Sequence, residues 1–190
     1  MQSKPARRSN EARTRETREA LLVAARNCFV SKGFAATGTP ELVAAAGMTR
    51  GALYHHFADK TDLFRAVIEA EAEAVAAAIR AAAPADVPVI EALLSGADAY
   101  FTAMEAPGRA RLLLVEAPAV LGLSELARLD DQTGGATLRE ALTALRLQAP
   151  IPETAQMLSA MFDRAALAIA EGADPALYRA ALAHLLNALA

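Results

Sequence analysis

The sequence AATGTPELVAAAGMTRGALYHHFADK, residues 35–60, has the pattern of two short helices joined at a glycine. Thr39 followed by Pro40 predicts a helix start, with the hydroxyl as the N-cap and the ring at the first helical position. Gly47 is expected to end this helix, because a tight turn needs a positive φ that glycine reaches without steric cost. Thr49 is placed to cap the next helix. Two helices joined in this way form a helix-turn-helix.

The second helix of this stretch has two distinct faces. Leu53 and Phe57 are four residues apart, so both side chains point inward. The rest of the helix is expected to be exposed, and it offers cations, hydroxyls, an imidazole and a glycine, which suit phosphate oxygens and base edges in a major groove. Two threonines at and before the start of the first helix of this stretch are added to this surface. The predicted DNA-binding residues are Thr37, Thr39, Thr49, Arg50, Gly51, Tyr54, His55 and Lys60.

The segment AGMTRGALYHHFADKTDLF, residues 46–64, resembles the signature of the TetR/AcrR family of bacterial transcriptional regulators. In that family the recognition helix carries a Gly-x-Leu-Tyr-x-His-Phe run followed by a lysine. The resemblance extends back to about Arg18 and covers roughly the first third of the chain. Gly38 and Pro40 depart from it, because polar or bulkier residues are usual there. The remainder of the chain resembles the family only in its length and its helical pattern.

Charge is distributed unevenly along the 190 residues. The net charge is −3, yet residues 1–60 carry ten Lys and Arg against five acids, a net of +5, which leaves −8 for the rest. A basic end on an acidic body fits a protein that touches nucleic acid with one end only, although a solvated charged face is the simpler alternative. No long uncharged apolar run and no secretion signal are seen, so we expect a cytoplasmic protein without a membrane contact.

The pattern predicts an all-α protein in three parts. Residues 1–12 are expected to be a disordered basic arm, which either tracks DNA phosphates or serves as a solubilising tail. Residues 13–60 form the three-helix DNA-binding domain, whose first helix runs over 14–32 and ends at Gly33. The single cysteine, Cys28, is expected to be a buried thiol, with a redox sensor as the alternative. Residues 61–190 form a larger helical domain for effector binding and dimerisation.

The larger domain is expected to contain seven helices, with Pro118 and the Gly134-Gly135 pair as interruptions. The first is a long helix that would connect the DNA-binding domain to the rest of the larger domain. The expected ranges are 60–83, 87–106, 109–117, 119–129, 136–147, 153–171 and 175–190. The last two helices have apolar residues on more than one side, which favours a homodimer interface over 153–190, as the family resemblance also implies. A monomer with both helices internal is the alternative. A dimer would read a palindromic site.

The family resemblance implies a small effector, mostly apolar, that alters DNA affinity when it binds the larger domain. The residues expected to line its pocket are apolar and aromatic with a few charges, the usual mixture of ligand sites, although the same residues suit an ordinary core. They are Tyr100, Phe101, Met104, Arg111, Glu116, Met157, Met161 and Phe162, with Asp163 or Arg164 as further orienting groups.

No catalytic or metal-binding pattern is found among the three histidines and the single cysteine, so the sequence predicts no enzyme, no metal and no cofactor. The favoured function is a repressor that leaves a palindromic operator when an effector binds. An activator, an effector-independent regulator and a helical protein-interaction module remain open alternatives.

Overall fold

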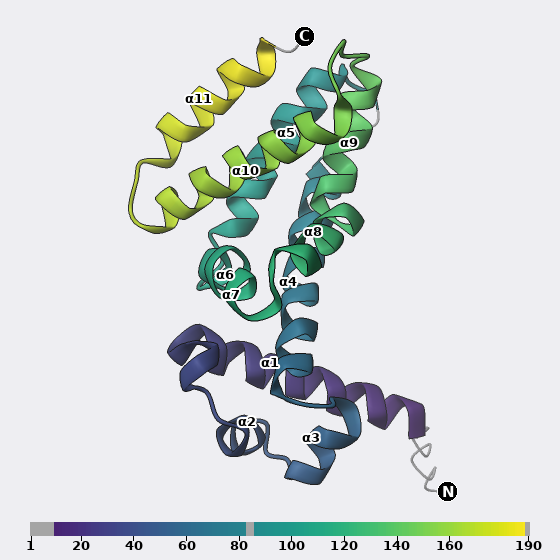
Figure 1. Ribbon diagram of the computed structural model, residues 1–190, viewed down its shortest axis with the longest axis vertical. Coiled ribbons are helices and arrows are strands. Elements are labelled where there is room, and N and C mark those ends of the chain that lie inside the picture. Colours follow the sequence, from purple (N-terminus) through teal and green to yellow (C-terminus); the bar gives the residue numbers. More distant parts are fainter. Residues whose placement is uncertain (1–9, 83–85, 189–190) are drawn as a thin grey trace, which may run out of the picture. The chain divides into compact units, whose positions relative to one another are not determined.

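The computed structural model describes residues 10–82 and 86–188, and every regular element within them is a helix (Figure 1). The chain forms two compact units, Met1–Val67 and Ile68–Ala190. Most of the predicted basic arm, with Lys4, Arg7 and Arg8, lies outside the described residues. None of the described helices is both long enough and apolar enough to cross a membrane.

The first unit contains α1 (Asn10–Ala36), α2 (Thr39–Ala45), α3 (Arg50–His56) and the beginning of α4 (Lys60–Ala82). α1 begins at Asn10, earlier than the predicted position 14. At Gly33 the backbone leaves the helical region, with φ 80° and ψ 164°, so the prediction that this glycine stops the first helix is confirmed. Gly47 has φ 64°, the left-handed conformation expected between α2 and α3.

Capping was predicted correctly for α3 and wrongly for α2. The Thr49 hydroxyl accepts a hydrogen bond from the Ala52 amide at 3.2 Å, so this cap is confirmed. For α2 the N-cap is Gly38, and Thr39 is already the first helical residue. The reason is that the extended backbone ends at Gly38, whose carbonyl accepts the amide of Leu42. This frees the Thr39 side chain for another partner.

An aromatic cluster forms the centre of the first unit. The Phe29 and Phe64 rings meet edge to face with centroids 5.1 Å apart, and Phe34 lies 4.9 Å from Phe64. Leu53 and Phe57 are buried against this unit, as their spacing predicted. Cys28 is buried as well, and burial raises the pKa of its thiol, which confirms the buried-thiol interpretation.

Lys60 has a structural role that the sequence did not indicate. Its Nζ donates hydrogen bonds to the carbonyl oxygens of Phe34, at 2.9 Å, and Thr37, at 3.0 Å. The same ammonium group lies 4.1 Å from the centroid of the Phe34 ring. Lys60 is therefore half-buried rather than fully exposed as predicted, and its charge is directed at the end of α1 and at Thr37.

The substitution Lys60→Met should destabilise the first unit by about 1–3 kcal/mol, because it leaves two carbonyls without a charged donor. Urea unfolding followed by circular dichroism would measure the loss. The matched control is Lys32→Met, which removes an exposed ion pair with Glu41 and should cost less than about 1 kcal/mol. Unchanged unfolding of Lys60→Met, together with a flatter salt dependence of DNA binding, would instead identify Lys60 as a phosphate contact.

Within the residues that the structure describes, the second unit comprises the rest of α4 and eight further helical segments. These are α5 (Val89–Met104), α6 (Arg109–Arg111), the π-helical segment η1 (Leu112–Glu116), α7 (Ala117–Leu121), α8 (Leu123–Gln132), α9 (Gly134–Ala144), α10 (Ile151–Ala170) and α11 (Pro175–Asn187). α10 packs on α9, α5 and α6, while α11 packs on α5. Their shared core includes Phe101, Leu142, Phe162 and Leu186.

The helices of this unit do not break at Pro118 or at the Gly134-Gly135 pair, where the sequence predicted interruptions. Pro118 falls inside a continuous helical run that ends at Gly122, where φ is 83°. The wider π turn of η1 leaves room for the proline ring, which would clash in a regular α-helix. The break between α8 and α9 is at Thr133, and both following glycines belong to α9. Gly135 is needed there for close approach, since a Cβ would lie 2.4 Å from Asp130 Oδ2.

Candidate nucleic-acid interface and effector cavity

Five predicted reading residues lie on the outer side of the helix-turn-helix. Their side chains or backbones are exposed on α3 and at its N-cap: Thr49, Arg50, Gly51, Tyr54 and His55. Hydrogen bonds from Arg50 and then from Thr39 lower the pKa of the Tyr54 hydroxyl. The group Arg50–Tyr54–Thr39 therefore connects α3 with α2 on the exposed side. Such a surface presents a forked guanidinium and a phenol, which can donate to base edges and phosphate oxygens.

Thr37 does not belong to this surface. Its side chain is 1% exposed, and its hydroxyl donates a 2.7 Å hydrogen bond to the Gly33 carbonyl. The prediction that Thr37 contacts DNA is contradicted, because the hydroxyl closes the turn after α1 and is shielded from any ligand. Of the predicted set, Thr37 is thus buried, and Lys60 is half-buried with bonds inside the unit.

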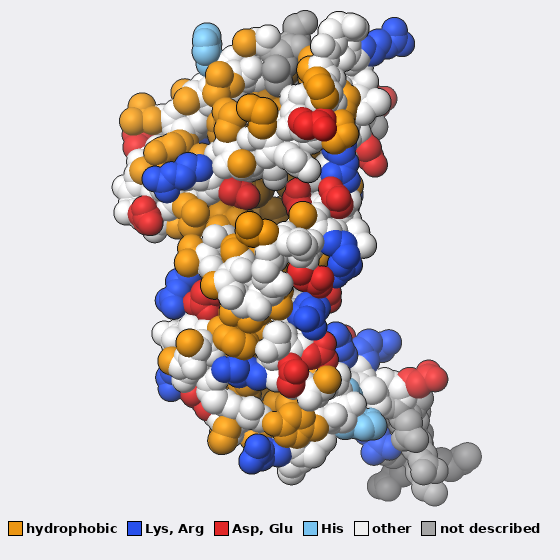
Figure 2. All heavy atoms as spheres, in the orientation of Figure 1, with side chains coloured by type: hydrophobic (Ala, Val, Ile, Leu, Met, Phe, Trp, Pro, Cys, Tyr) orange, Lys and Arg blue, Asp and Glu red, His pale blue; other side chains and the backbone are white. Residues whose placement is uncertain are grey.

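Arg18 on α1 contacts Phe57 at the end of α3. The sequence did not indicate this contact. Its guanidinium lies 5.0 Å from the centroid of the Phe57 ring. The neighbouring His56 has a lowered pKa, caused first by burial and then by the charges of His55 and Arg18. No sequence spacing signals this contact, because the two residues come from different helices. Figure 2 shows further Lys and Arg side chains on the surface of this unit.

The predicted effector residues separate into two groups. Phe101, Met104 and Phe162 are buried and Tyr100 is half-buried, all within the second unit. Met157 is 69% exposed and Met161 is 36% exposed, so the prediction that they line an internal pocket is wrong. They face outward because the opposite side of α10, with Leu158 and Phe162, covers the core.

Arg111 and Glu116 are not among the residues that line the cavity described below. Arg111 Nη2 lies 2.8 Å from Glu116 Oε1, and the arginine side chain is 55% exposed. The pair therefore links the end of α6 to the end of η1, with the arginine largely exposed and the Glu116 side chain only 12% exposed.

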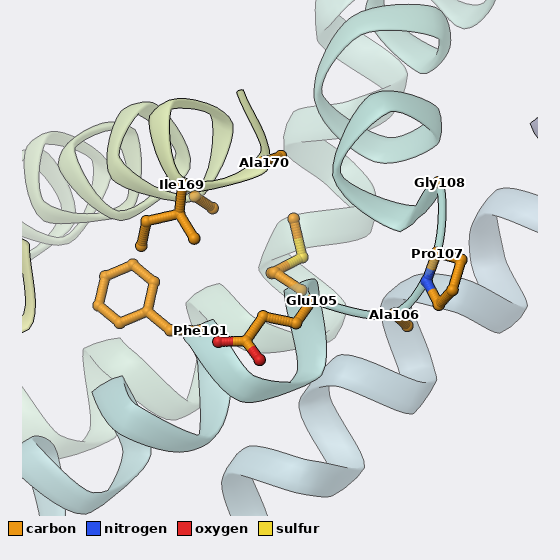
Figure 3. A pocket seen from close by; sticks show the side chains of 9 residues that line it. Phe101, Glu105, Ala106, Pro107, Gly108, Ile169 and Ala170 are labelled. Atoms are coloured by element: carbon orange, nitrogen blue, oxygen red, sulfur yellow. The ribbon is translucent and has the colours of Figure 1, made fainter. Parts of the chain in front are cut away.

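A cavity of about 310 Å³ lies where α5 and α10 end (Figure 3). Phe101 and Met104 line it, as predicted, together with the segment 105–108 and three residues of α10. Its volume is at the lower end of the range for small-molecule sites. Only these two of the eight predicted lining residues are confirmed to line this cavity.

A half-buried acidic group lies beside the aromatic core. The Tyr100 hydroxyl donates to Asp163 Oδ1 at 2.7 Å. Burial raises the pKa of Asp163 to about 6, and it also raises the pKa of Asp130, whose Oδ1 accepts the Gly135 amide at 3.2 Å. The pKa of Tyr100 is well above its usual value, first because of burial and then because of Asp163. Asp163 consequently changes charge close to neutral pH.

Comparison with known families covers both units. Residues 21–67 match the family model described as bacterial regulatory proteins of the tetR family. Residues 90–190, more than half of the chain, match the model described as a tetracyclin repressor-like C-terminal domain. The two matches include the whole helix-turn-helix and the cavity described above.

Individual relatives agree with these matches. The chain is 44% identical over 61 residues to the transcriptional repressor BepR of Brucella suis, which covers 32% of this chain and 29% of BepR. It is 30% identical over 110 residues to the transcriptional activator FasR of Mycolicibacterium smegmatis, which covers 58% of this chain and 50% of FasR. The chain therefore spans at most half the length of these curated relatives.

Solved structures cover the chain more completely. A TetR-family transcriptional regulator from Pectobacterium atrosepticum is 32% identical, with a TM-score of 0.74 over 96% of this chain and 97% of that one. The TetR-like regulator LfrR from Mycobacterium smegmatis, solved in complex with proflavine, is 25% identical, with a TM-score of 0.65 over 90% of this chain and 95% of that one.

Proposed function

Because the chain belongs to the TetR family of bacterial transcriptional regulators, we propose that it is a repressor that leaves a palindromic operator when a small effector binds its second unit. Members of this family are regulators rather than enzymes, and they bind DNA as dimers. The DNA-binding domain would comprise residues 13–60 and the effector and dimerisation domain residues 61–190, acting on DNA in the cytoplasm.

The observation that carries the DNA-reading role is the exposed Arg50–Tyr54–Thr39 group. Arg50 lies at the start of α3, where its guanidinium is exposed and bonded to the Tyr54 hydroxyl. A guanidinium held in this way is suited to bidentate recognition of a guanine edge. Thr49, Gly51 and His55 would contact the DNA backbone or permit its close approach. Arg18 extends the same cationic surface from α1.

The first experiment is a selection of bound fragments from random DNA, followed by titration of the winning site. We expect a palindromic winner, and Arg50→Ala should relax base preference at one position of each half-site by about 1–3 kcal/mol. The control is Arg80→Ala, because Arg80 is an exposed arginine of the second unit paired with Glu73. Recovery of no motif, or an Arg50→Ala variant with unchanged selectivity, would contradict the proposed reading face.

Exposed apolar side chains on the last two helices support a homodimer. Met157 and Met161 on α10 and Leu177 and Leu185 on α11 are all exposed, although a soluble monomer seldom shows so many large apolar groups together. We place the dimer interface on these two helices, within residues 153–190. Sedimentation equilibrium should give twice the chain mass, and a monomer that still bound a palindrome would rule this interface out.

The direction of regulation has a second candidate. BepR is named a repressor and FasR an activator, and both resemble this chain. A reporter gene behind the selected operator would decide between them. Lower expression when the protein is present supports repression, whereas higher expression supports activation.

A further inference from the structure

The cavity of the second unit has a mixed wall. Phe101, Met104 and Ile169 supply its apolar sides, and the Glu105 carboxylate is the charged group that lines it. Figure 3 shows the Glu105 side chain directed from the end of α5 towards the side occupied by Phe101. The described lining residues include no Lys, Arg or His. The wall therefore offers apolar contact and one negative charge.

Two helix ends add to the negative potential at this place. α5 ends at Met104 and α10 ends at Ala170, and both final turns line the cavity. The C-terminal end of a helix carries a partial negative charge, because its last carbonyl groups point along the axis. Both helices are long enough for this effect, with 16 and 20 residues. Carboxylate and helix ends together favour a positively charged occupant.

Arg179 shows that a cation is accepted at the edge of this site. Its Nη2 donates to Glu105 Oε1 at 3.2 Å, and its guanidinium carbon lies 5.8 Å from the centroid of the Phe101 ring. Its Nε is held by Asp98 Oδ1 at 2.6 Å. The protein's own guanidinium thus contacts two lining residues in the geometry of a cation against a carboxylate and an aromatic face.

We propose that the cavity binds a small organic cation, mainly apolar, whose charged group pairs with Glu105 while its apolar part contacts Phe101, Met104 and Ile169. This rests on the proposed function, for which it defines the chemical class of the effector. An ammonium group with an attached ring would combine the two kinds of contact, and Arg179 would compete with it for Glu105.

The cavity wall is also connected to the helix that leads to the DNA-binding unit. The segment 106–108 continues directly into Arg109, whose Nε donates to Glu71 Oε2 on α4 at 2.8 Å. Arg109 Nη1 donates to the Ala103 carbonyl at 2.6 Å, and the Glu71 side chain is 9% exposed. An occupant that moves this segment would therefore act on a buried ion pair of α4.

Calorimetry without DNA tests the charge requirement with three probes that share one skeleton. These are 3-phenylpropylamine, 3-phenylpropan-1-ol and 3-phenylpropanoate, compared at pH 7. We expect the amine to bind at least about tenfold more tightly than the carboxylate, a difference of about 1.4 kcal/mol. Equal binding of all three probes, or binding of none, would overturn the proposal.

Variants locate the amine. Glu105→Gln should remove the preference for the amine, whereas Glu91→Gln, at an exposed acid in the first turn of the same helix, should retain it. Arg179→Ala should strengthen amine binding, because it removes the competing cation. A structural role of Arg179 alone would predict unchanged or weaker binding, so this result distinguishes the two. Amine preference that survives Glu105→Gln would contradict the assignment.

A larger side chain placed in the cavity tests whether the amine binds there. Ala170→Phe should abolish binding of the amine, while Ala127→Phe, at an exposed position of α8, should not. Thermal unfolding would establish that both variants are folded. If Ala170→Phe is not folded, the result for Glu105→Gln decides whether the amine binds in this cavity.

Fluorescence anisotropy with the selected operator then separates the cavity proposal from the proposed function. Amine binding without DNA release supports the cavity but contradicts the effector role, and a selected operator without amine binding contradicts the cavity alone.

Discussion

Phe64→Ala is expected to lower the free energy of unfolding of the first unit by about 3–5 kcal/mol and to abolish DNA binding. Phe64 is 0% exposed and contacts both Phe29 and Phe34, with ring centroids 5.1 and 4.9 Å away. Its removal leaves a cavity below the helix-turn-helix. α2 and α3 have seven residues each, so they depend on this packing for their stability.

Urea unfolding and operator titration of Phe64→Ala would measure the two effects. The control is Val23→Ala in the same unit, because Val23 is 62% exposed and should lose less than about 0.5 kcal/mol. If Phe64→Ala retained the parent's unfolding midpoint and operator affinity, the aromatic cluster could not be what holds the reading helices in place.

Asp163→Asn is expected to stabilise the second unit by about 2 kcal/mol at pH 8 and to have little effect at pH 4. Burial raises the pKa of Asp163 from 3.8 to about 6, so the folded state binds its proton more tightly than the unfolded state does. The stability contributed by that proton is complete below about pH 4 and is lost as the pH rises through about 6. Asparagine has no charge to lose, and its carbonyl can still accept the hydrogen bond from Tyr100.

Thermal unfolding of the parent and the variant between pH 4 and pH 8 would reveal the difference. Asp86→Asn is the matched control, since Asp86 is exposed and its substitution should change the stability by less than about 0.5 kcal/mol. A variant that is less stable than the parent at pH 8 would mean that ionised Asp163 contributes a favourable interaction. A constant difference at every pH would also contradict the assigned cause.

The same chemistry explains which site residues could be predicted. Arg50, Tyr54 and His55 were identified because a helix of known phase has one buried face, and Leu53 with Phe57 define that face. Met157 and Met161 were misplaced for the opposite reason. α10 is apolar on two sides, and periodicity alone does not say which side meets the core. Of the predicted lining residues, only Phe101 and Met104 line the cavity between the ends of α5 and α10.

The sequence by itself determined the features that depend on near neighbours along the chain. The positive φ at Gly33 and Gly47 and the Thr49 cap all act within a few residues. Each is a local bond or a local steric limit, and the residue type is enough to specify it. The helical fold class and the helix-turn-helix follow from such local features repeated along the chain.

Only the tertiary structure decided the partners that come from distant segments. The ammonium group of Lys60 binds a carbonyl 26 residues earlier, the Tyr100 hydroxyl meets Asp163 63 residues later, and Arg179 reaches Glu105 across 74 residues. Folding brings these groups together, and burial then sets their charge and their role. A lysine that the sequence predicts to be exposed, such as Lys60, can instead hold two distant backbone carbonyls, because the environment of a residue is formed by elements that are remote in the chain.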